Sequence, residues 1–552
     1  MKIVLLGDLG STGGYHVGDE AMAESVVEQI GARRQVEVVA VSGDPEDAVS
    51  RYGWGAVPRI GFAAPLTTDA QRDSRLNTVL RAAGGETNGL AWADDAWKVI
   101  HAVADADAVV VSGGGNLSST WPEHVYERVA LARLAALFNK RLVVTGQTIG
   151  PHLTGRHAEL VAEFLTSAVL VGVRESSSRE LALRLGVVPD RLVSVVDDAT
   201  YMRGSDAGSA LPEGPYVAAT FSADTGLADF DGCISSIADL LDGVAESFGL
   251  RVVLIPHHGT ESDGLVVGDV KMHELIADAV HSATVQMLPI LTAREVAAIT
   301  RNAALVISTR YHPIVFALGA SVPALGIGVD AYTSTKIHGS MANYGVGDYA
   351  VSVGSLAQGG ARAAVDELLA RSNDVIAHLD RINEMRRNES VAWWDSVVAF
   401  LADGDSAIGA GLARADTLEG GDWTAVGRAL RTWSDEVSLR LGAERIQNAT
   451  MASEAVPLVE QVSELEREVA ALSGDLSTSA DEIESLRASV SAAHQLVSAK
   501  LRPMATWIDD RPSIGGLRAE LDAVYNSRTF RYLTLLRKIY VRVRTVLHPS
   551  PQ

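Results

Sequence analysis

The sequence predicts an α/β protein with two Rossmann-like domains that face each other across a cleft. A helical segment, a coiled coil and a basic amphipathic tail are expected to follow. Three observations predict this fold: short apolar runs alternate with amphipathic stretches, the alternation restarts once, and a heptad pattern begins only late in the chain. At 552 residues the chain is too long for one core. Its composition, with 47% hydrophobic and 21% charged residues, is typical of a globular protein.

The first domain is expected over residues 1–205. Continuous runs of Val, Leu and Ile separated by helical patterns indicate a parallel sheet that is buried on both faces. Many of these runs end in glycine or a polar residue, at the carboxyl edge where ligands bind to open α/β sheets. The predicted strands lie in KIVLLGD, VEVVAVSGD, ADAVVVSGGG, RLVVTGQTIG, LVGVRE and LVSVVDD.

The second domain is expected over residues 206–402. Its strand pattern ends near Tyr349, and two such domains leave a cleft between the carboxyl edges of their sheets. The helical stretch from Ala361 to Ala402, which includes Trp393 and Trp394, is expected to pack back on the domains. The predicted strands lie in PYVAATFSA, RVVLIPHHG, VQMLPIL, ALVISTR and VPALGIG.

A heptad seam follows a connector with helical segments at 403–450. Over residues 451–500 the spacing of apolar residues alternates between four and three, which is typical of the a and d positions of a coiled coil. This pattern predicts a homo-oligomer, and a single long helix packed on its own chain is the alternative. The seam consists of Leu458, Val462, Leu465, Val469, Leu472, Leu476, Ile483, Leu486 and Val490.

The last predicted segment, 501–552, contains the basic stretch RTFRYLTLLRKIYVRVR at 528–544. It has no acidic residue although the whole chain has a net charge of -22. A basic amphipathic segment suits an anionic membrane surface, so peripheral membrane contact is expected. An acidic protein partner and an exposed helix end remain alternatives. The acidic chain as a whole argues against a general nucleic-acid binder.

Composition also restricts the compartment and the chemistry. Cys233 is the one cysteine, which excludes a disulfide framework and a cysteine-based metal cluster and fits a reducing compartment. The apolar run at the N-terminus is shorter than a signal-peptide core, and no run of about 18 apolar residues predicts a membrane span. We therefore expect a cytoplasmic protein, held at the inner face of the membrane by its tail.

Three glycine-rich loops follow strands of the first domain, at 7–21, 112–120 and 145–152. The first opens a helix whose N-terminus is suited to an anionic or polar ligand, and it fits neither a dinucleotide fingerprint nor a P-loop. Each loop alone is explained by a turn that needs glycine, but three on one sheet edge favour a binding surface. The loop residues expected near a ligand are Asp19, Glu20, Gly113, Gly114, Gly115, Asn116 and Gln147.

Charged residues also end strands at this predicted edge. Arg174 ends LVGVRE and offers a guanidinium fork for carboxylate or phosphate, or an ion pair with Glu175 or Glu180. Asp198 ends LVSVVDD and is expected to contact a ligand. No metal site is expected: the acidic pair at 105 and 107 precedes its strand, and the histidines at 257 and 258 lack zinc-ligand spacing.

In the second domain the apolar passage VISTRYHPIVFALGASVPALG is interrupted by Arg310, Tyr311 and His312. Pro313 fits the first position of a helix, with His312 at its cap. A structural histidine is the usual explanation of a lone imidazole at a helix start. An Arg and a His two residues apart at a predicted ligand edge favour a functional site.

Together these motifs resemble the polysaccharide pyruvyl transferase family over residues 1–349. The resemblance implies a fold like that of GT-B glycosyltransferases. It also implies transfer of the enolpyruvyl carbon skeleton of phosphoenolpyruvate (PEP) to sugar hydroxyls, usually as a cyclic ketal, with release of phosphate and no required metal or cofactor. The chain departs from the family pattern at His16, usually Asn, and in GQT, usually GQG. The matching motifs are GDEA, GGGNL, GQTIGP, VRESSS, LGV, VVDDA and TRYHPIVFALGASVP, with Lys336 at the position of the family's usual Lys.

The resemblance also implies roles for individual residues. Arg174, Arg310, Lys336 and the loop 113–116 are expected to bind the donor. Arg310 and His312 are expected to be catalytic, with His312 as a general acid or base. The acceptor is expected to be a cell-surface polysaccharide or a lipid-linked glycan precursor. A glycosyltransferase that uses a nucleotide sugar, or a non-catalytic coiled-coil scaffold, is the alternative. The residues assigned to the acceptor or to loop structure are Asp19, Glu20, Gln147, Tyr311 and Asp198.

Overall fold

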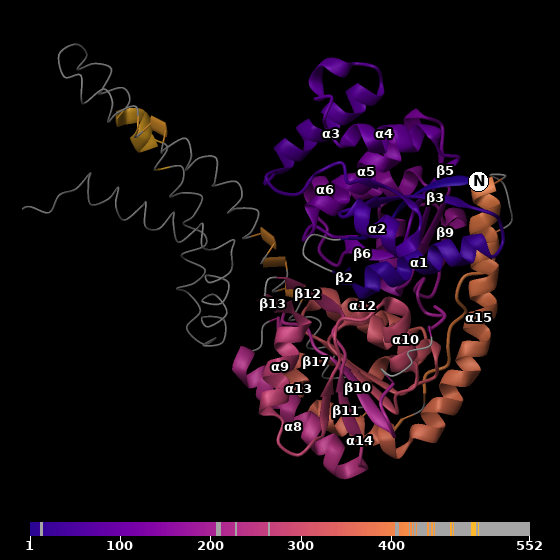
Figure 1. Ribbon diagram of the computed structural model, residues 1–552, viewed down its shortest axis with the longest axis vertical. Coiled ribbons are helices and arrows are strands. Elements are labelled where there is room, and N and C mark those ends of the chain that lie inside the picture. The colour runs from indigo at the N-terminus through magenta and orange to yellow at the C-terminus, as the bar shows by residue number, and fades with distance from the viewer. Residues whose placement is uncertain are drawn as a thin grey trace, which may run out of the picture. The chain divides into compact units, whose positions relative to one another are not determined.

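The computed structural model describes residues 1–10, 15–205, 211–226, 229–262, 265–402 and 408–418, together with isolated positions between 420 and 495. Both α/β domains belong to one compact unit, which ends at Arg440 (Figure 1). The basic tail lies outside the described residues, and so does the heptad seam apart from a few helical positions. Among the described residues, no helix is both long and apolar enough to cross a bilayer.

The N-terminal domain is built on a sheet in the order β4-β3-β1-β5-β7-β8-β9, in which every neighbouring pair is parallel. All the predicted strands form. β4 and β6 were not expected, and β6 lies within the GGGNL motif that was predicted to be a loop, where it pairs with β7. The strands are β1 (Lys2–Leu6), β3 (Glu37–Ser42), β4 (Gly55–Pro58), β5 (Ala108–Val111), β6 (Gly114–Leu117), β7 (Arg141–Ile149), β8 (Leu170–Val173) and β9 (Leu192–Ser194).

Helices connect these strands, as parallel pairing requires. Their ends follow local sequence signals. Asp44 caps α2 and Pro45 occupies its first turn, while Thr68 and Gln71 form a capping box at the start of α3. The helices are α1 (Val17–Gly31), α2 (Pro45–Tyr52), α3 (Asp69–Ala83), α4 (Ala96–Asp105), α5 (Pro122–Leu137), α6 (Gly155–Ser167) and α7 (Ser176–Arg184), with short 3-10 turns at Thr87–Gly89 and Pro189–Arg191.

The C-terminal domain has a second parallel sheet, in the order β14-β11-β10-β15-β16-β17. The prediction of two parallel α/β sheets is therefore confirmed. The strands are β10 (Tyr216–Thr220), β11 (Arg251–Leu254), β14 (Val285–Met287), β15 (Leu305–Ser308), β16 (Ala324–Gly328) and β17 (Ala350–Ser352). The helices are α8 (Phe230–Phe248), α9 (Asp269–Ala279), α10 (Ala293–Arg301), α11 (Tyr311–Gly319), α12 (Ala331–Ala342), α13 (Val353–Ala357), α14 (Gly360–Ala370) and α15 (Ser372–Ala402), and a 3-10 turn spans Gly347–Tyr349.

A small antiparallel sheet joins the two domains. The first glycine-rich loop contains β2 (Tyr15–His16), which pairs with β12 (His258–Ser262) of a hairpin completed by β13 (Leu265–Gly268). His16 lies opposite His258, and the Val17 N–H donates to the His257 carbonyl at 3.0 Å. The loop was predicted to present its amides and a helix N-terminus to an anionic or polar ligand. At residues 15–17 its backbone instead bonds to the other domain.

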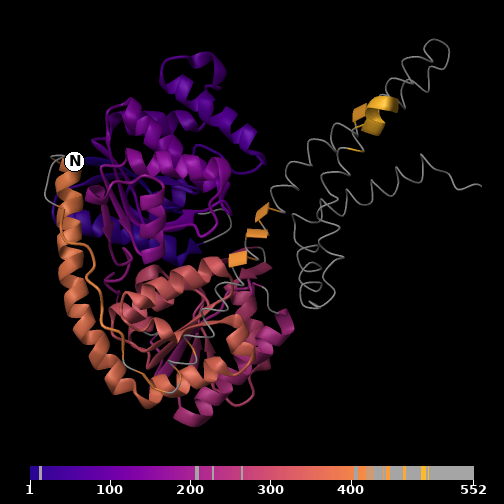
Figure 2. The same ribbon diagram turned by 180° about the vertical axis from the view of Figure 1, so that it is seen from behind.

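Helix α15 runs along both domains, from the C-terminal domain to the N-terminal one (Figures 1 and 2). Asn383 donates to the Leu318 carbonyl of α11 at 2.7 Å. Farther along, the indole of Trp393 is buried in a cluster that includes Ile3 and Leu5 of β1. The stretch from 361 to 402 therefore packs back on the domains as expected, and α15 completes the core of the N-terminal domain.

Trp393→Ala should lower the free energy of unfolding by about 3–5 kcal/mol, because it deletes a large side chain from a packed core. Trp393 is 4% exposed, whereas Val391 on the same helix is 53% exposed. The control substitution Val391→Ala should change stability by less than about 0.5 kcal/mol. Denaturant unfolding followed by tryptophan fluorescence and circular dichroism would measure both, and equal stabilities would contradict the placement of α15.

Candidate active site

The carboxyl edges of the two sheets meet at one interface, where two glycines allow close approach. A Cβ added to Gly18 of α1 would lie 2.1 Å from Nδ1 of His312. A Cβ added to Gly115 of β6 would lie 2.2 Å from the hydroxyl of Tyr332 in α12. A side chain at either position would displace the neighbouring residue, which belongs to the other domain. The glycines of GDEA and GGGNL are thus required by contact between the domains.

Arg174 is a buried cation at this interface. It follows β8 and is 2% exposed. Its guanidinium pairs closely with Asp197, donates to Thr148 Oγ1 at 2.9 Å and lies 3.2 Å from Glu175 Oε1. Of the two ion pairs considered from the sequence, the structure contains the one with Glu175, while Asp197 is the partner that was not considered.

The ring of Tyr311 lies at the centre of the basic residues. The guanidinium carbon of Arg174 is 4.5 Å from the ring centroid, and Nζ of Lys336 is 5.7 Å from it. The imidazole of His312 meets the same ring edge-to-face at 5.1 Å. Cations over an aromatic face are attracted by the ring quadrupole, so Tyr311 holds Arg174 and Lys336 on one site. The structure therefore brings together four residues predicted from the sequence.

Lys336 is a half-buried cation without an acidic partner. Its Nζ lies 3.8 Å from the centroid of the Tyr332 ring, and among the described residues no carboxylate forms an ion pair with it. Burial and, as a smaller effect, the nearby charge of Arg174 together lower the pKa of Lys336 to about 7. A basic site with one cation unpaired favours the binding of an anion.

His312 lies in the first turn of α11. Its side chain is 9% exposed, and its Nε2 is 3.8 Å from Asp197 Oδ1 and has no hydrogen-bond partner among the described residues. Burial and the charge of Arg174 hold the pKa of His312 well below its ordinary value, so the imidazole is neutral near pH 7. The helix begins at Tyr311, two residues before the start predicted from Pro313, because Arg310 is the N-cap.

Arg310 is held by a carboxylate that the sequence did not suggest. Its Nη2 donates to Asp269 Oδ1 at 2.5 Å, and its Nε lies 3.1 Å from the same oxygen. Asp269 also accepts from the backbone N–H of His257 at 3.0 Å and is fully buried. This ion pair orients the guanidinium of Arg310, which remains 25% exposed.

Three of the predicted residues lie behind the loops. Glu20 accepts from Tyr52 and from the Gly10 N–H at 3.1 Å. Gln147 donates to the Ser112 carbonyl at 2.5 Å. Asp198 accepts from the Gly113 N–H at 2.8 Å and from Thr145, and burial together with the charge of Asp197 raises its pKa to about 7. These residues hold the loops in place.

The remaining loop residues lie in different surroundings. Asp19 is 18% exposed, and its carboxylate lies 3.1 Å from Nδ1 of His16. Gly114 lies in β6 beside Gln147. Asn116 was predicted to bind the donor, but its amide donates to Asp8 at 2.8 Å and so belongs to a neighbouring cluster.

The sequence reasoning missed Asp8, Asp269 and Tyr332. Asp8 ends KIVLLGD at the predicted ligand edge, so the rule that selected Arg174 applies to it equally. Tyr332 and Asp269 carried no such signal. Tyr332 lies close to β6 of the other domain, and Asp269 is placed by the hairpin that ends with β13. The described residues contain no group of three His, Cys, Asp or Glu side chains that could hold a metal ion.

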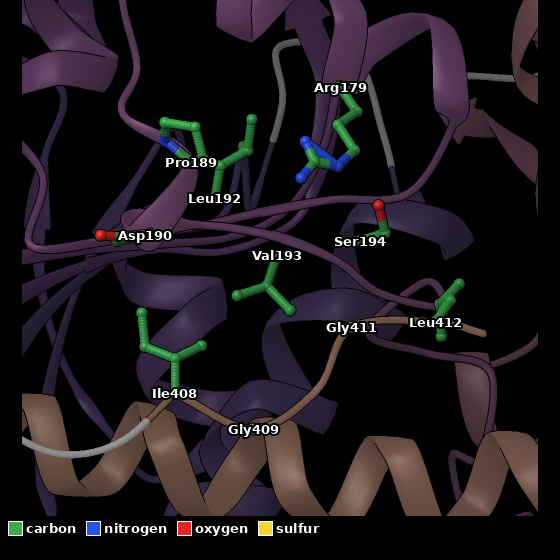
Figure 3. A pocket seen from close by; sticks show the side chains of 10 residues that line it. All are labelled: Arg179, Pro189, Asp190, Leu192, Val193, Ser194, Ile408, Gly409, Gly411 and Leu412. Carbon is green, nitrogen blue, oxygen red and sulfur yellow. The ribbon is translucent and has the colours of Figure 1, made fainter.

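A cavity of about 380 Å³ lies away from these residues, along the edge strand β9. Figure 3 shows Val193 and Ile408 pointing toward one another in it, with Arg179 of α7 on the opposite side. The Leu412 N–H donates to the Ser194 carbonyl at 3.0 Å, so the segment after α15 runs beside β9. None of the residues predicted to form the site lines this cavity.

Comparison with known proteins identifies a family. A family model described as polysaccharide pyruvyl transferase matches residues 16–331. No curated protein matches the sequence.

Solved structures with a similar arrangement include UDP-GlcNAc 2-epimerase from Methanocaldococcus jannaschii, at 12% identity and a TM-score of 0.43, covering 67% of this chain and 93% of that one. MurG from Acinetobacter baumannii has 14% identity and a TM-score of 0.40, and the calicheamicin glycosyltransferase CalG4 has 15% identity and a TM-score of 0.44. Each of these two matches covers 73% of this chain and 99% of the other chain. At these identities and TM-scores the likenesses are too distant to bear on activity.

A lysine with a pKa of about 7 is half neutral at neutral pH, and the neutral amine is the nucleophile. Lys336 should therefore react with trace acetic anhydride with a pH midpoint near 7. Lys271 is the matched control, because its hydrogen bond to Glu274 raises its pKa and its side chain is 58% exposed. Peptide mass spectrometry would compare the two sites. Identical pH profiles would contradict the unpaired environment of Lys336.

Proposed function

Since the chain belongs to the polysaccharide pyruvyl transferase family, we propose that this transferase moves the enolpyruvyl group of PEP onto sugar hydroxyls. The acceptor is a cell-surface polysaccharide or a lipid-linked glycan precursor, the product is a ketal, and phosphate is released. The donor, the acceptor and the product are the proposed parts of this assignment.

The observation that supports the donor best is the unpaired charge of Lys336 beside Arg174. The whole chain has a net charge of -22, yet these two cations lie together around Tyr311. PEP is a compact anion with a carboxylate and a phosphate, so it would supply Lys336 with the ion pair that it lacks among the described residues. Arg310 has a fixed guanidinium, because Asp269 holds its Nε and Nη2, and no described residue occupies its Nη1, which is available for a third contact.

The reaction needs proton transfers that the site can support. In ketal formation an acceptor oxygen bonds to C2 of PEP while C3 gains a proton and becomes a methyl group. A second hydroxyl then bonds to C2 as the bond between C2 and the phosphate oxygen breaks. His312 lies beside the cations, and a bound anion would raise its pKa, because opposite charge favours the imidazolium form. It is our candidate for a proton transfer to or from the donor.

His312→Ala should lower phosphate release from PEP by about 10²- to 10⁴-fold, the usual contribution of a positioned acid or base. The exposed histidine His281 provides the control substitution, His281→Ala, which should keep the wild-type rate. The assay uses purified enzyme, PEP and a panel of p-nitrophenyl glycosides of hexoses and N-acetylhexosamines, with phosphate release and a pyruvyl mass increment as readouts.

Two outcomes would contradict this proposal. A His312→Ala enzyme with the wild-type rate would exclude His312 from the chemistry. Nucleotide release from a nucleotide sugar, without phosphate release from PEP, would instead identify a glycosyltransferase.

For the location, we propose that the basic stretch 528–544 binds an anionic membrane surface, where lipid-linked acceptors reside, and that the heptad seam forms a homo-oligomer. The support is the sequence pattern alone, since the basic stretch, and the heptad seam apart from a few helical positions, lie outside the residues that the structure describes.

Deletion of residues 528–552 should release the protein from phosphatidylserine-containing vesicles in a sedimentation assay, because it removes every basic residue of that stretch. Vesicles of phosphatidylcholine alone are the control and should bind the full chain weakly. Undiminished binding after the deletion would exclude the tail as the membrane contact.

A further inference from the structure

A second polar cluster borders the proposed donor site, and its centre is Asp8. This residue follows β1 with φ of 56° and is 3% exposed. Four donors, two of them from α5, converge on its carboxylate. They are Arg128 in close contact, Asn116 at 2.8 Å, His124 Nδ1 at 2.9 Å and Arg59 at 3.1 Å.

Two members of this cluster, Arg59 and His124, are partly exposed and could contact a ligand. The side chains of Arg59 and His124 are 21% and 18% exposed, whereas Arg128 is fully buried. Nη2 of Arg59 is buried and finds no hydrogen-bond partner among the described residues. A buried donor without a partner is costly, so a ligand oxygen at Nη2 would relieve that cost.

The surroundings of His124 fix its tautomer. With three other donors on its oxygens, Asp8 is ionised and can only accept hydrogen bonds. Nδ1 of His124 therefore carries the proton, and Nε2 keeps its lone pair. The nearest acidic oxygen to Nε2, on Glu123, is 4.0 Å away, outside hydrogen-bond distance. A carboxylate that orients an imidazole in this way is the usual support of a general base.

This pair of residues adjoins the proposed donor site on two sides. The Asn116 amide lies 3.5 Å from His124 Nδ1, and the preceding residue, Gly115, contacts Tyr332 and Lys336. On the other side, the charges of both Asp8 and His312 act on the Asp19 carboxylate, so Asp19 is near both of them. Figure 1 shows β6 of the N-terminal domain next to α12 of the C-terminal domain.

We propose that His124, positioned by Asp8, is the general base that accepts the proton of the attacking acceptor hydroxyl, and that Nη2 of Arg59 binds an oxygen of the same sugar. This inference rests on the proposed function and divides its proton transfers between the domains. The hydroxyl proton passes to Nε2 of His124 as the sugar oxygen bonds to C2 of PEP, and His312 delivers a proton to C3. The second hydroxyl then displaces phosphate from C2, and its proton leaves with the phosphate.

The test compares His124→Gln with His157→Gln. The control histidine is also half-buried and paired with an aspartate, Asp69 at 3.0 Å, in the same domain. With PEP and the p-nitrophenyl glycoside that the wild-type enzyme uses fastest, His124→Gln should lose about 10²- to 10⁴-fold in kcat. Its affinity for PEP, measured by calorimetry, should equal that of the wild type, and His157→Gln should keep both values.

A pH profile separates catalysis from structure. The wild-type kcat should fall at low pH, because a general base must be unprotonated to accept a proton, and the His124→Gln profile should lack this acidic limb. Arg59→Lys should raise the KM for the glycoside and retain the limb. The Gln variant keeps the charged groups around position 124, so a change in the pH profile would not come from them. These groups are Asp8, Arg59, Glu123, Glu127 and Arg128.

A His124→Gln enzyme with the wild-type kcat and acidic limb would overturn this inference and leave the proposed function intact. Loss of PEP binding in that variant would also overturn it, by placing His124 at the donor. If the wild-type enzyme does not consume PEP, the proposed function fails first and the inference with it. Should His124→Gln not fold, His124→Ala supplies the test: added imidazole should restore part of its turnover, and no restoration would overturn the proposal.

Discussion

The buried charge of Arg174 is the constraint on which the rest of the site depends. A guanidinium that is 2% exposed needs partners, and it finds them in Asp197, Glu175 and the ring of Tyr311. The same charge lowers the pKa values of Lys336 and His312, after the larger effect of burial. One residue at the end of β8 therefore influences both the anion-binding lysine and the candidate acid or base of the other domain.

This arrangement requires that the two sheet edges stay in register, and several contacts between the domains hold them there. β2 pairs with β12, and Arg294 of α10 forms ion pairs with Glu24 and Glu28 of α1 at 2.7 Å and 2.9 Å. Helix α15 adds apolar packing on both domains. Contacts this numerous favour a fixed interface, and substrates would then bind to a site whose charges are already in place.

The two proton-transfer candidates differ in how the fold orients them. His124 has an ionised carboxylate on Nδ1, which fixes its tautomer and leaves Nε2 as an acceptor. Among the described residues, the ion-pair contact of His312 is with Asp197 at 3.8 Å, and the imidazole lies against Gly18 of the opposite domain. An imidazole whose protonation responds to a bound anion suits proton delivery to the donor. An imidazole whose tautomer is fixed suits proton removal from the acceptor.

The sequence by itself determined the parallel sheets, the family, and the position of Arg174, Arg310 and His312 at strand ends, because apolar periodicity and motif spacing are local properties of the chain. It did not determine which charges are neutralised. Asp269 reaches Arg310 through a hairpin, Asp197 reaches Arg174 from another strand end, and Asn116 turns to Asp8 instead of the donor site. Those pairings join residues far apart in the chain, so only the tertiary structure decided that Lys336 of this site has no ion pair among the described residues.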